Sequence, residues 1–544
     1  MPKNINIFTK IKFQAVLWLF FYLLIFSICF NSTASYLDPD FGWHLKMGQE
    51  IINTGAVPHI NTINYTLAGA RWVDHEWLSE ALMYKAYTVT GYQGIEIILS
   101  LLIVLILFLL NRFIKKQSET SIYSDYLIMA LEIFALIAAL PSFGIRLQEI
   151  GLLFFLLLIL IIKNYEKNKN YKILWFLLPL LYLWSNLHGT FLIAFFVCGI
   201  FIGVKIVELI LHKKIPEKYL DYTNILTGKQ ISIFFVFALA AGLTTLLTPY
   251  GGELYSFLFT YSNTYYMTVI AEWWPQWFFP YSYAQLLFIS FTLSIICLNI
   301  YLALKKSKKI DLLDLALILI FSAMALKSRR HTQLLVIISL PIIFVFIKDF
   351  LDLNNLKPQV VEKKSLYKLG GKIFIIIILI LISAGKLADS NSVKNPFQDF
   401  CGSYPCAAIK FIQDNPQYNS YKLYNNYAWG GFLIWTYPTR QLFIDGRMPQ
   451  ANYENYSLLE EYKSFYDKDA IKISSKINKH DIKLFMLDNS DNKMKLSWLE
   501  KYFFMIDENK VNEKKDELKD YLNTSAEWKI IYQDKLSVIY AKNN

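Results

Sequence analysis

The sequence predicts a polytopic α-helical membrane protein with a small α/β domain at its C-terminal end. Hydrophobic residues make up 55% of the 544-residue chain, far more than soluble globular proteins usually carry. They are grouped in blocks of about 17–22 residues, the length at which a helix crosses the hydrocarbon core of a bilayer. The last part of the chain lacks such blocks and instead alternates short strand-like and helix-like segments.

The apolar blocks predict about eleven membrane helices. Their approximate positions are 13–33, 94–112, 124–142, 147–163, 173–188, 190–210, 231–248, 284–304, 311–327, 332–349 and 372–386. The first block is either a cleaved signal peptide or an uncleaved helix. We favour the uncleaved helix, because the alternation of basic loops along the chain fits with that helix in place.

Basic residues between the blocks predict the orientation of the chain. Clusters such as Arg112, Lys115 and Lys116 recur in alternate loops, as in cytoplasmic loops of membrane proteins. This places the N-terminus in the cytoplasm, residues after 386 outside it, and the protein in the inner (cytoplasmic) membrane as a multi-pass protein. The net charge of +11 therefore reflects these loops, and no motif indicates nucleic-acid binding.

Three segments are then expected outside the cytoplasm, at 34–93, 249–283 and 387–544. The chain divides into a transmembrane domain, 1–386, which includes the loop 34–93, and a soluble extracytoplasmic α/β domain, 387–544. In the soluble domain, strands are expected at YKLYN, FLIWTY, QLFID, IKLFML and WKIIYQ, and helices near 404–414 and 455–467.

Two cysteines, Cys401 and Cys406, lie in the soluble domain within CGSYPC. In an oxidising compartment we expect a disulfide between them; a free or metal-bound pair is the alternative. We expect no required metal elsewhere, because the histidines of the loop 34–93 show no known ligand spacing. A divalent cation is nevertheless left open.

The loop 34–93 contains six acidic and three basic residues, with tryptophans placed among the acids. Asp38 and Asp40 follow the first membrane block, and Asp74, His75 and Glu76 come near the other end of the loop. The loop is either a folded, solvated element on the membrane surface or a sugar site. Aromatic rings stack on apolar sugar faces, and carboxylates bind or deprotonate hydroxyl groups.

Positive charge also occurs on the side where it is rare. Arg146 lies in one predicted outer turn, and Arg329, Arg330 and His331 lie in another. Such a cluster suits a lipid phosphate or pyrophosphate, since arginine binds phosphate with two donors. The alternatives are pairing with Glu149 or Glu272, binding of ordinary anionic lipid, or an error of one block in the count.

A third polar segment is WSNLHGTF, in which Asn186 and His188 end one membrane block. A histidine at such a position is often a cap or an interfacial residue, and a role in holding a substrate or the acidic loop is the alternative.

Several motifs in order resemble a group of bacterial membrane proteins placed with the GT-C glycosyltransferases. They are Asp38-Pro39-Asp40, Trp43-His44-Leu45, Gly55-x-x-Pro58, Trp72-Val73-Asp74-His75-Glu76-Trp77-Leu78, Trp184-x-Asn186-x-His188-Gly189, Pro249-Tyr250-Gly251, Glu272-Trp273, Tyr427-x-Trp429-Gly430-Gly431 and Ile444-Asp445-Gly446-Arg447. The resemblance covers at least residues 38–447. The chain departs from the pattern at Phe41-Gly42, where bulkier residues are common.

The resemblance implies a GT-C fold and transfer of a sugar from a polyprenyl-phosphate donor to an acceptor outside the cytoplasm. It implies Asp40 as the catalytic base, with Asp38 the next candidate, in an inverting reaction that needs no cofactor. The phosphate would lie on Arg146, Arg329, Arg330 and His331. Residues expected to bind the substrate are Trp43, His44, Asp74, His75, Glu76, Asn186, His188 and Glu272.

The partners implied are a polyprenyl-phosphate-linked sugar, a glycan, lipid or protein acceptor, and membrane lipid. Three other interpretations stay open. A transporter or flippase of lipid-linked sugars would use buried ionisable residues, for which Glu132 is the candidate. An O-antigen-ligase-like or polymerase-like enzyme would use a pyrophosphate donor. The protein could also be a scaffold whose outer domain binds a partner, but this interpretation assigns no function to the acidic residues of the first loop.

Overall fold

The computed structural model divides into two compact units, which we describe separately. The described residues are 5–117, 122–260, 264–277, 283–305, 309–353, 365–389, 393–490, 493–503, 505–512 and 516–543. The first unit, here called the membrane unit, comprises residues 1–36, 93–251 and 271–392. The second, here called the α/β unit, comprises residues 37–92, 252–270 and 393–544.

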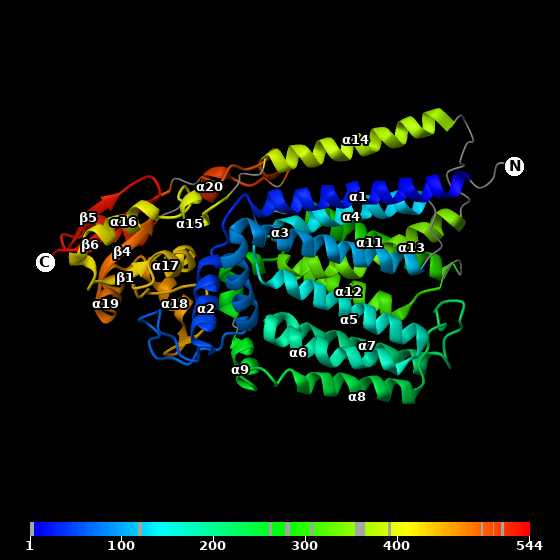
Figure 1. The fold of residues 1–544 in the computed structure, drawn as a ribbon. Helices are drawn as coiled ribbons and strands as arrows, with labels where there is room; N and C mark the ends of the chain where they lie inside the picture. Colours follow the sequence, from blue (N-terminus) through cyan, green and yellow to red (C-terminus); the bar gives the residue numbers. More distant parts are fainter. Residues whose placement is uncertain are drawn as a thin grey trace. The chain divides into compact units, whose positions relative to one another are not determined.

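Long helices build the membrane unit, and most of them run beside one another (Figure 1). Helix α3, Trp77–Gln117, begins in the α/β unit and continues into the membrane unit. The other helices of the membrane unit are α1 (Ile5–Thr33), α4 (Ile122–Ala139), α5 (Gln148–Asn168), α6 (Leu177–Leu187), α7 (Leu192–Leu211), α8 (Gly228–Thr244), α11 (Tyr283–Leu304), α12 (Leu312–Lys327), α13 (Thr332–Leu353) and α14 (Ser365–Asp389).

This chain is a membrane protein. Among the described residues, seven helical segments are long and apolar enough to cross a bilayer: Phe13–Thr33, Trp77–Gln117, Ser124–Ser142, Gln148–Asn168, Gly189–Leu211, Tyr283–Leu304 and Arg329–Leu351. Each predicted block overlaps a helix, and the total of eleven spans stays a prediction. Large apolar side chains such as Phe235 and Leu243 of α8 are 53% and 59% exposed, as expected of a surface that faces lipid.

One group of charged side chains inside the membrane unit is paired within itself. Lys205 donates to Glu208 at 2.8 Å and also to Glu166. Lys163 lies 2.6 Å from Asp314 and 3.2 Å from Glu166. A charge removed from water is tolerated in such a helix bundle only when it is compensated in this way.

A glycine interrupts α3 close to the point where the two units divide. Gly91 has φ 69° and ψ −170°, a backbone conformation that side chains larger than hydrogen disfavour. The division between the units falls directly after it, between Tyr92 and Gln93. The helix is therefore two helices, one in each unit.

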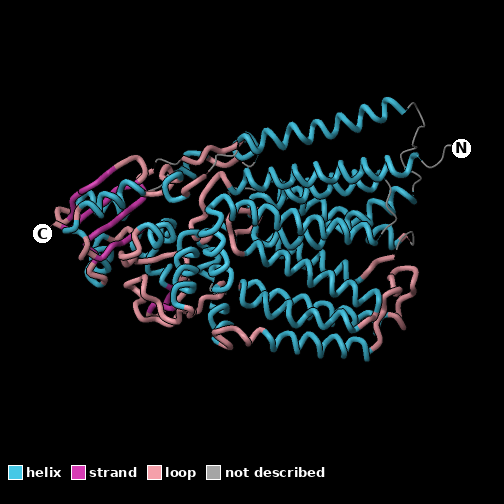
Figure 2. The backbone as a smooth tube through the Cα atoms, viewed as in Figure 1, coloured by secondary structure: helices cyan, strands magenta, loops and turns pink. Residues whose placement is uncertain are grey.

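The α/β unit contains a four-stranded sheet, whose strands lie beside one another in Figure 2. The order is β1-β4-β6-β5; β1 and β4 are parallel, and the other two pairs are antiparallel. The strands of the unit are β1 (Lys422–Asn425), β4 (Ile482–Asp488), β5 (Trp528–Gln533) and β6 (Ser537–Lys542), with β2 (Asn452–Tyr453) and β3 (Tyr456–Ser457) as a separate hairpin.

The α/β unit also contains ten short helices in its described part, of which α16, α19 and α21 pack against strands of the sheet. The ten helices are α2 (Phe41–Thr54), α9 (Glu253–Thr260), α10 (Thr264–Val269), α15 (Pro396–Asp399), α16 (Cys406–Asp414), α17 (Gly430–Thr436), α18 (Leu458–Lys463), α19 (Ala470–Lys479), α20 (Glu508–Asn512) and α21 (Glu517–Thr524).

Two of the predicted strands are wrong. FLIWTY is helix α17, in which Phe432, Leu433 and Ile434 are all buried; a short apolar run that is buried on all sides shows no period by which helix and strand could be told apart. QLFID forms no strand, although Leu442 makes isolated parallel bridges to Leu423 and Asn64. The predictions for β1, β4 and β5 are confirmed, and β6 was not predicted.

The grouping of the first loop differs from the predicted domain division, which joined residues 34–93 to the membrane helices. Residues 37–92 instead form one compact unit with residues 393–544. The loop carries several buried aromatic side chains, including Phe41, Trp43 and Trp72, and its helix α2 packs along α17. The loop thus shares a hydrophobic core with the C-terminal part of the chain.

Candidate functional site

The turn that carries Asp38 and Asp40 is fixed by its own side chain. Oδ1 of Asp38 accepts a hydrogen bond of 2.9 Å from the backbone N–H of Asp40, and Asp38 is only 4% exposed. This is an Asx turn, which favours the close reversal at Pro39. Asp40 then occupies the N-cap position of α2 without using its side chain as a cap. The half-buried Asp40 carboxylate therefore makes no capping hydrogen bond to the first turn of α2.

Two neighbours determine the position of the Asp40 carboxylate. Nε1 of Trp43, one turn into α2, donates a hydrogen bond of 2.8 Å to Oδ1 of Asp40. Gly446 lies against the same oxygen, and a Cβ atom at Gly446 would come within 2.2 Å of it. The glycine of the IDGR motif is therefore needed where that motif meets the Asp-Pro-Asp turn.

Glycines also allow α17 to approach the same turn. A Cβ atom at Gly431 would lie 2.1 Å from the carbonyl oxygen of Pro39, and one at Gly42 would lie 2.2 Å from the carbonyl oxygen of Gly431. Backbone meets backbone here, so neither glycine can be replaced without moving a helix. The Gly42 departure noted in the sequence is thus part of the packing between α2 and α17.

Arg447, the last residue of the IDGR motif, is buried and faces the protein. Its guanidinium donates to both carboxylate oxygens of Asp445, and to Oδ1 of Asn61 and Oδ1 of Asn64 at 3.0 Å each. The guanidinium also lies 4.8 Å from the ring centre of Trp72. Arg447 therefore ties the loop 37–92 to the C-terminal part of the chain.

Acids and histidines from both ends of the first loop converge in a buried cluster. Nδ1 of His44 lies 2.9 Å from Oε1 of Glu80 and 3.6 Å from Oε2 of Glu76. Nε2 of His75 lies 3.4 Å from the other oxygen of Glu76. Oδ1 of Asp74 accepts from the backbone N–H of Glu76, and burial raises the pKa of Asp74. Glu80 was not among the predicted site residues; its position four residues after Glu76, one helical turn along the chain, was the available signal.

Cations gather around one glutamate in the membrane unit. Arg146 forms an ion pair with Glu272, and Nη1 of Arg330 lies 3.9 Å from Oε2 of Glu272. The guanidinium of Arg330 also lies 5.1 Å from the ring centre of Trp273. Burial opposes ionisation of Glu272, but the two guanidinium groups outweigh it and lower its pKa. Pairing with Glu272, one of the alternatives read from the sequence, does occur, with two arginines sharing one carboxylate.

The remaining residues of this region are held by the backbone. The N–H of Arg329 donates to the carbonyl oxygen of Trp274, and the Ser328 hydroxyl donates to that of Glu272 at 3.2 Å. Nδ1 of His331 lies 3.1 Å from the carbonyl oxygen of Met324. These contacts connect the segment before α13 to the 3₁₀ turn η4, Ala271–Trp273.

The WSNLHGTF segment closes the junction between α6 and α7. Nδ1 of His188 accepts from the backbone N–H of Thr190 at 3.0 Å and lies 3.0 Å from its hydroxyl oxygen. Nδ2 of Asn186 donates to the carbonyl oxygen of Tyr182, four residues earlier. His188 therefore acts as a cap, the structural alternative considered from the sequence.

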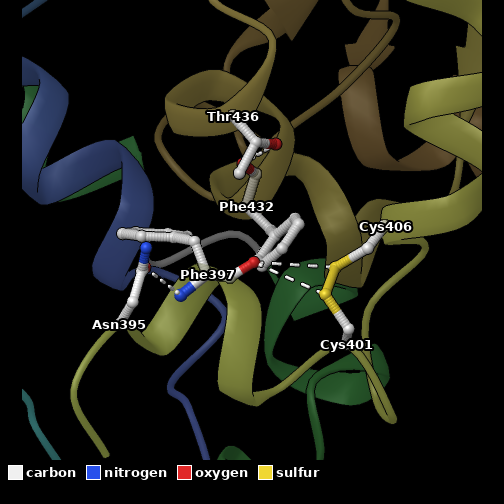
Figure 3. The surroundings of a disulfide bond; sticks show 6 residues. All are labelled: Asn395, Phe397, Cys401, Cys406, Phe432 and Thr436. Carbon is white, nitrogen blue, oxygen red and sulfur yellow. Dashed lines mark hydrogen bonds between the residues drawn. A yellow bond between two sulfur atoms is a disulfide. The ribbon is translucent and has the colours of Figure 1, made fainter.

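A disulfide closes a short loop in the α/β unit (Figure 3). Cys401 and Cys406 are disulfide-bonded, with a Cα–Cα distance of 5.4 Å, and their sulfurs lie 3.5 and 3.6 Å from the carbonyl oxygen of Phe397. Within this loop the hydroxyl of Tyr404 donates to the carbonyl oxygen of Leu37 at 2.9 Å. The loop thus contacts the chain directly before Asp38.

Solved structures of the oligosaccharyltransferase of Archaeoglobus fulgidus are similar to this chain. The apo form matches with a TM-score of 0.52 at 12% identity, over 89% of this chain and 70% of that one. A form tethered by a disulfide to an acceptor peptide containing the NVT sequon matches with a TM-score of 0.52 at 11% identity, over 99% of this chain and 74% of that one. The chain has a GT-C fold. No protein-family model and no curated protein matches it.

Within this GT-C fold, the predicted site residues fall into groups. The α/β unit brings together the residues of the first loop, Asp38, Asp40, Trp43, His44, Asp74, His75 and Glu76. The membrane unit brings together Arg146, Glu272 and Arg330. Arg329 directly precedes Arg330 in the chain. Asn186 and His188 lie in the membrane unit at a helix junction of their own.

Proposed function

We propose that this chain is a glycosyltransferase that transfers a sugar from a polyprenyl-phosphate donor to an acceptor on the outer face of the inner membrane. The observation that carries the proposal is the Asp40 carboxylate, which is held by Trp43 and Gly446 at the start of α2 in a GT-C fold. A carboxylate with one oxygen fixed by a neutral donor is held in one orientation, as a general base requires. The N-terminus would be cytoplasmic and the α/β unit extracytoplasmic.

In this proposal Asp40 accepts the proton of an acceptor hydroxyl or amide as that group attacks the anomeric carbon. Attack occurs opposite the departing phosphate, so the anomeric configuration inverts. Asp38 maintains the turn that presents Asp40, since its carboxylate is committed to the N–H of Asp40. A lipid phosphate is already a fair leaving group, and the mechanism needs no general acid.

We assign the phosphate of the donor to the cations of the membrane unit. Arg146 and Arg330 share Glu272, so the three residues retain one net positive charge, to which Arg329 adds another. Fixed guanidinium groups stabilise the charge that builds on a departing phosphate without reorganising during the reaction. A pyrophosphate donor would use the same cations, and the donor panel below separates the two.

We propose the acceptor only as a class of molecule, namely a peptide, a glycan or a lipid. The similar structures include one tethered with an acceptor peptide, and a peptide is therefore the first acceptor to test, followed by glycan and lipid. The same assay covers all three, because the acceptor is supplied as a crude envelope extract and identified from the labelled product.

The test uses purified full-length protein with a panel of radiolabelled polyprenyl-phosphate and polyprenyl-pyrophosphate sugars. Asp40→Asn is compared with Glu50→Gln, a matched control on the same helix whose nearest cation is Lys46 at 3.9 Å. We expect transfer with the wild type and Glu50→Gln and none with Asp40→Asn. Transfer by Asp40→Asn at the wild-type rate would remove the proposed base.

One observation supports a transporter of lipid-linked sugars as the second candidate. Glu132 of α4 is fully buried, and neither of its carboxylate oxygens has a hydrogen-bond partner in the described part of the chain. A transporter needs such a group along its path. Under the transferase proposal Glu132→Gln retains sugar transfer; loss of lipid-linked sugar movement in vesicles, with no transfer by the wild type, would favour the transporter.

A further inference from the structure

The buried cluster of His44, Glu76 and Glu80 is not used by the proposed mechanism. One ligand atom from each residue lies within 4.8 Å of the others. All three residues are buried, at 6%, 7% and 0% exposure. His44 lies in α2, Glu80 in the first turn of α3 and Glu76 directly before α3, and more than twenty residues of loop separate the two helices.

Close packing of the two helices brings these side chains together. A Cβ atom at Gly48 of α2 would lie 2.1 Å from the carbonyl oxygen of Glu80 in α3. Only glycine therefore permits this approach, and the approach places Glu80 opposite His44, one turn before Gly48.

Two carboxylate oxygens at the cluster lack the compensation that buried carboxylates need. Oε2 of Glu80 and Oδ2 of Asp74 are buried and have no hydrogen-bond donor in the described part of the chain, and the two carboxyl groups lie within hydrogen-bonding reach of each other. Both oxygens are acceptors, so neither can satisfy the other unless a proton or a cation lies between them. An ionised carboxylate left buried in this state is strongly unfavourable unless a proton or cation compensates it.

The charges of the cluster have the same sign. Asp74, Glu76 and Glu80 contribute three carboxylates, and the histidines facing them are His44 and His75. Arg447 is the cation nearby, and its positive charge acts on Glu80, but its guanidinium donates its hydrogen bonds to Asp445, Asn61 and Asn64. A divalent cation would neutralise most of the charge.

We propose that His44, Glu76 and Glu80 bind one divalent transition-metal cation of the Zn²⁺ or Mn²⁺ class. Nδ1 of His44 and one oxygen from each glutamate supply a nitrogen and two oxygens. An imidazole nitrogen with carboxylates selects this class over Mg²⁺ and Ca²⁺, which prefer oxygen alone. The Asp74 carboxylate adjoins Glu80 and completes or orients the set. The cation joins α2 to α3 and so braces the helix that Asp40 begins.

The experiment measures the metal without any sugar donor. Full-length protein in detergent is treated with EDTA, desalted and titrated with Mn²⁺, with free Mn²⁺ followed by electron paramagnetic resonance. Bound Zn²⁺ is counted by elemental analysis after dialysis. We expect one equivalent per chain, and affinity at least about tenfold lower in Glu80→Gln and in His44→Gln.

A second buried histidine–glutamate pair provides the matched control. Nε2 of His480 lies 2.6 Å from Oε1 of Glu461 in the same unit, and this pair does not form part of a three-ligand group among the described residues. Glu461→Gln should keep the wild-type stoichiometry and affinity. Bound metal should also raise the melting temperature of the wild type, and not that of Glu80→Gln.

A wild type that takes up no stoichiometric metal overturns the proposal, as does unchanged affinity in both cluster variants. If Glu80→Gln does not fold, His44→Gln and the metal-dependent melting temperature of the wild type decide. A proton shared by Asp74 and Glu80 would give a wild type without metal and with a melting temperature unaffected by EDTA. The proposal does not need sugar transfer, so failure of the transferase assay leaves this result intact.

Discussion

Nε1 of Trp43 donates a hydrogen bond of 2.8 Å to Oδ1 of Asp40, one helical turn before it. We predict that Trp43→Phe keeps the fold and lowers the rate of transfer about tenfold or more, because a hydrogen bond to a charged group is worth about 1.5–3 kcal/mol. Steady-state kinetics with the active donor check this. Trp435→Phe, which alters a ring packed on Phe397 in the same unit, should retain most activity.

Replacing Gly446 by alanine should affect activity more than stability. The new Cβ atom would lie 2.2 Å from Oδ1 of Asp40, which is the end of a side chain and can move away. The carboxylate would leave its hydrogen bond with Trp43, and transfer should fall at least tenfold while the melting temperature changes little. Gly402→Ala is the control, since a Cβ atom there meets nothing within 4 Å. Full activity in Gly446→Ala would contradict the role of this contact.

Removing the Arg447 guanidinium should unfold the α/β unit at lower temperature. Arg447→Met leaves Asp445 buried without its cation and removes the bonds to Asn61 and Asn64. Breaking a buried ion pair in this way costs about 3–5 kcal/mol. Thermal unfolding in detergent measures the change, and Lys542→Met, at an exposed pair with Glu527, should change stability by less than about 1 kcal/mol.

Glu461 gives the α/β unit a defined response to acid. Burial opposes its ionisation, but hydrogen bonds from His480 and Tyr456 outweigh burial and lower the pKa of Glu461 below its ordinary 4.5. A lowered pKa contributes stability that is complete above pH 4.5 and is lost as the pH falls through the folded-state pKa. Melting temperatures between about pH 3 and 7 should fall more steeply in the wild type than in Glu461→Gln. Parallel curves would contradict the assignment.

Loss of the disulfide should have a moderate cost. Cys401 and Cys406 close a loop of five residues' separation, for which the chain-entropy model gives about 2 kcal/mol. Cys401→Ser with Cys406→Ser should lower the melting temperature and loosen Tyr404 from the carbonyl oxygen of Leu37. Reducing agent should reproduce the shift in the wild type and have no effect on the double variant.

The sequence allowed the membrane helices and the α/β character of the C-terminal part to be predicted, because both depend on local patterns. The length of the apolar blocks identifies the membrane helices. The β-branched and aromatic content of three segments identifies the strands β1, β4 and β5. FLIWTY shows where this fails. Its helical state depends on Gly431 lying against Pro39, a contact between segments almost four hundred residues apart.

The candidate site could be predicted in its residue types and only partly in its geometry. Asp40 and Trp43 stood out because they are close in the chain, and their spacing of three matches one turn of helix. No local sequence pattern predicts the contact between Asp40 and Gly446 or the contact between His44 and Glu80. Both arise from tertiary packing, on which a single sequence carries no direct information.

The close contact of Gly431 and Gly446 with the Asp-Pro-Asp turn also determines the point during synthesis at which the acidic site can assemble. The segments that contact residues 38–40 are synthesised roughly four hundred residues after them, or about 20–80 s later at ordinary elongation rates. Throughout that interval the first loop has no partner for its buried aromatic face. A nascent chain that has not reached Arg447 therefore already carries the described helices of the membrane unit but lacks an assembled acidic site.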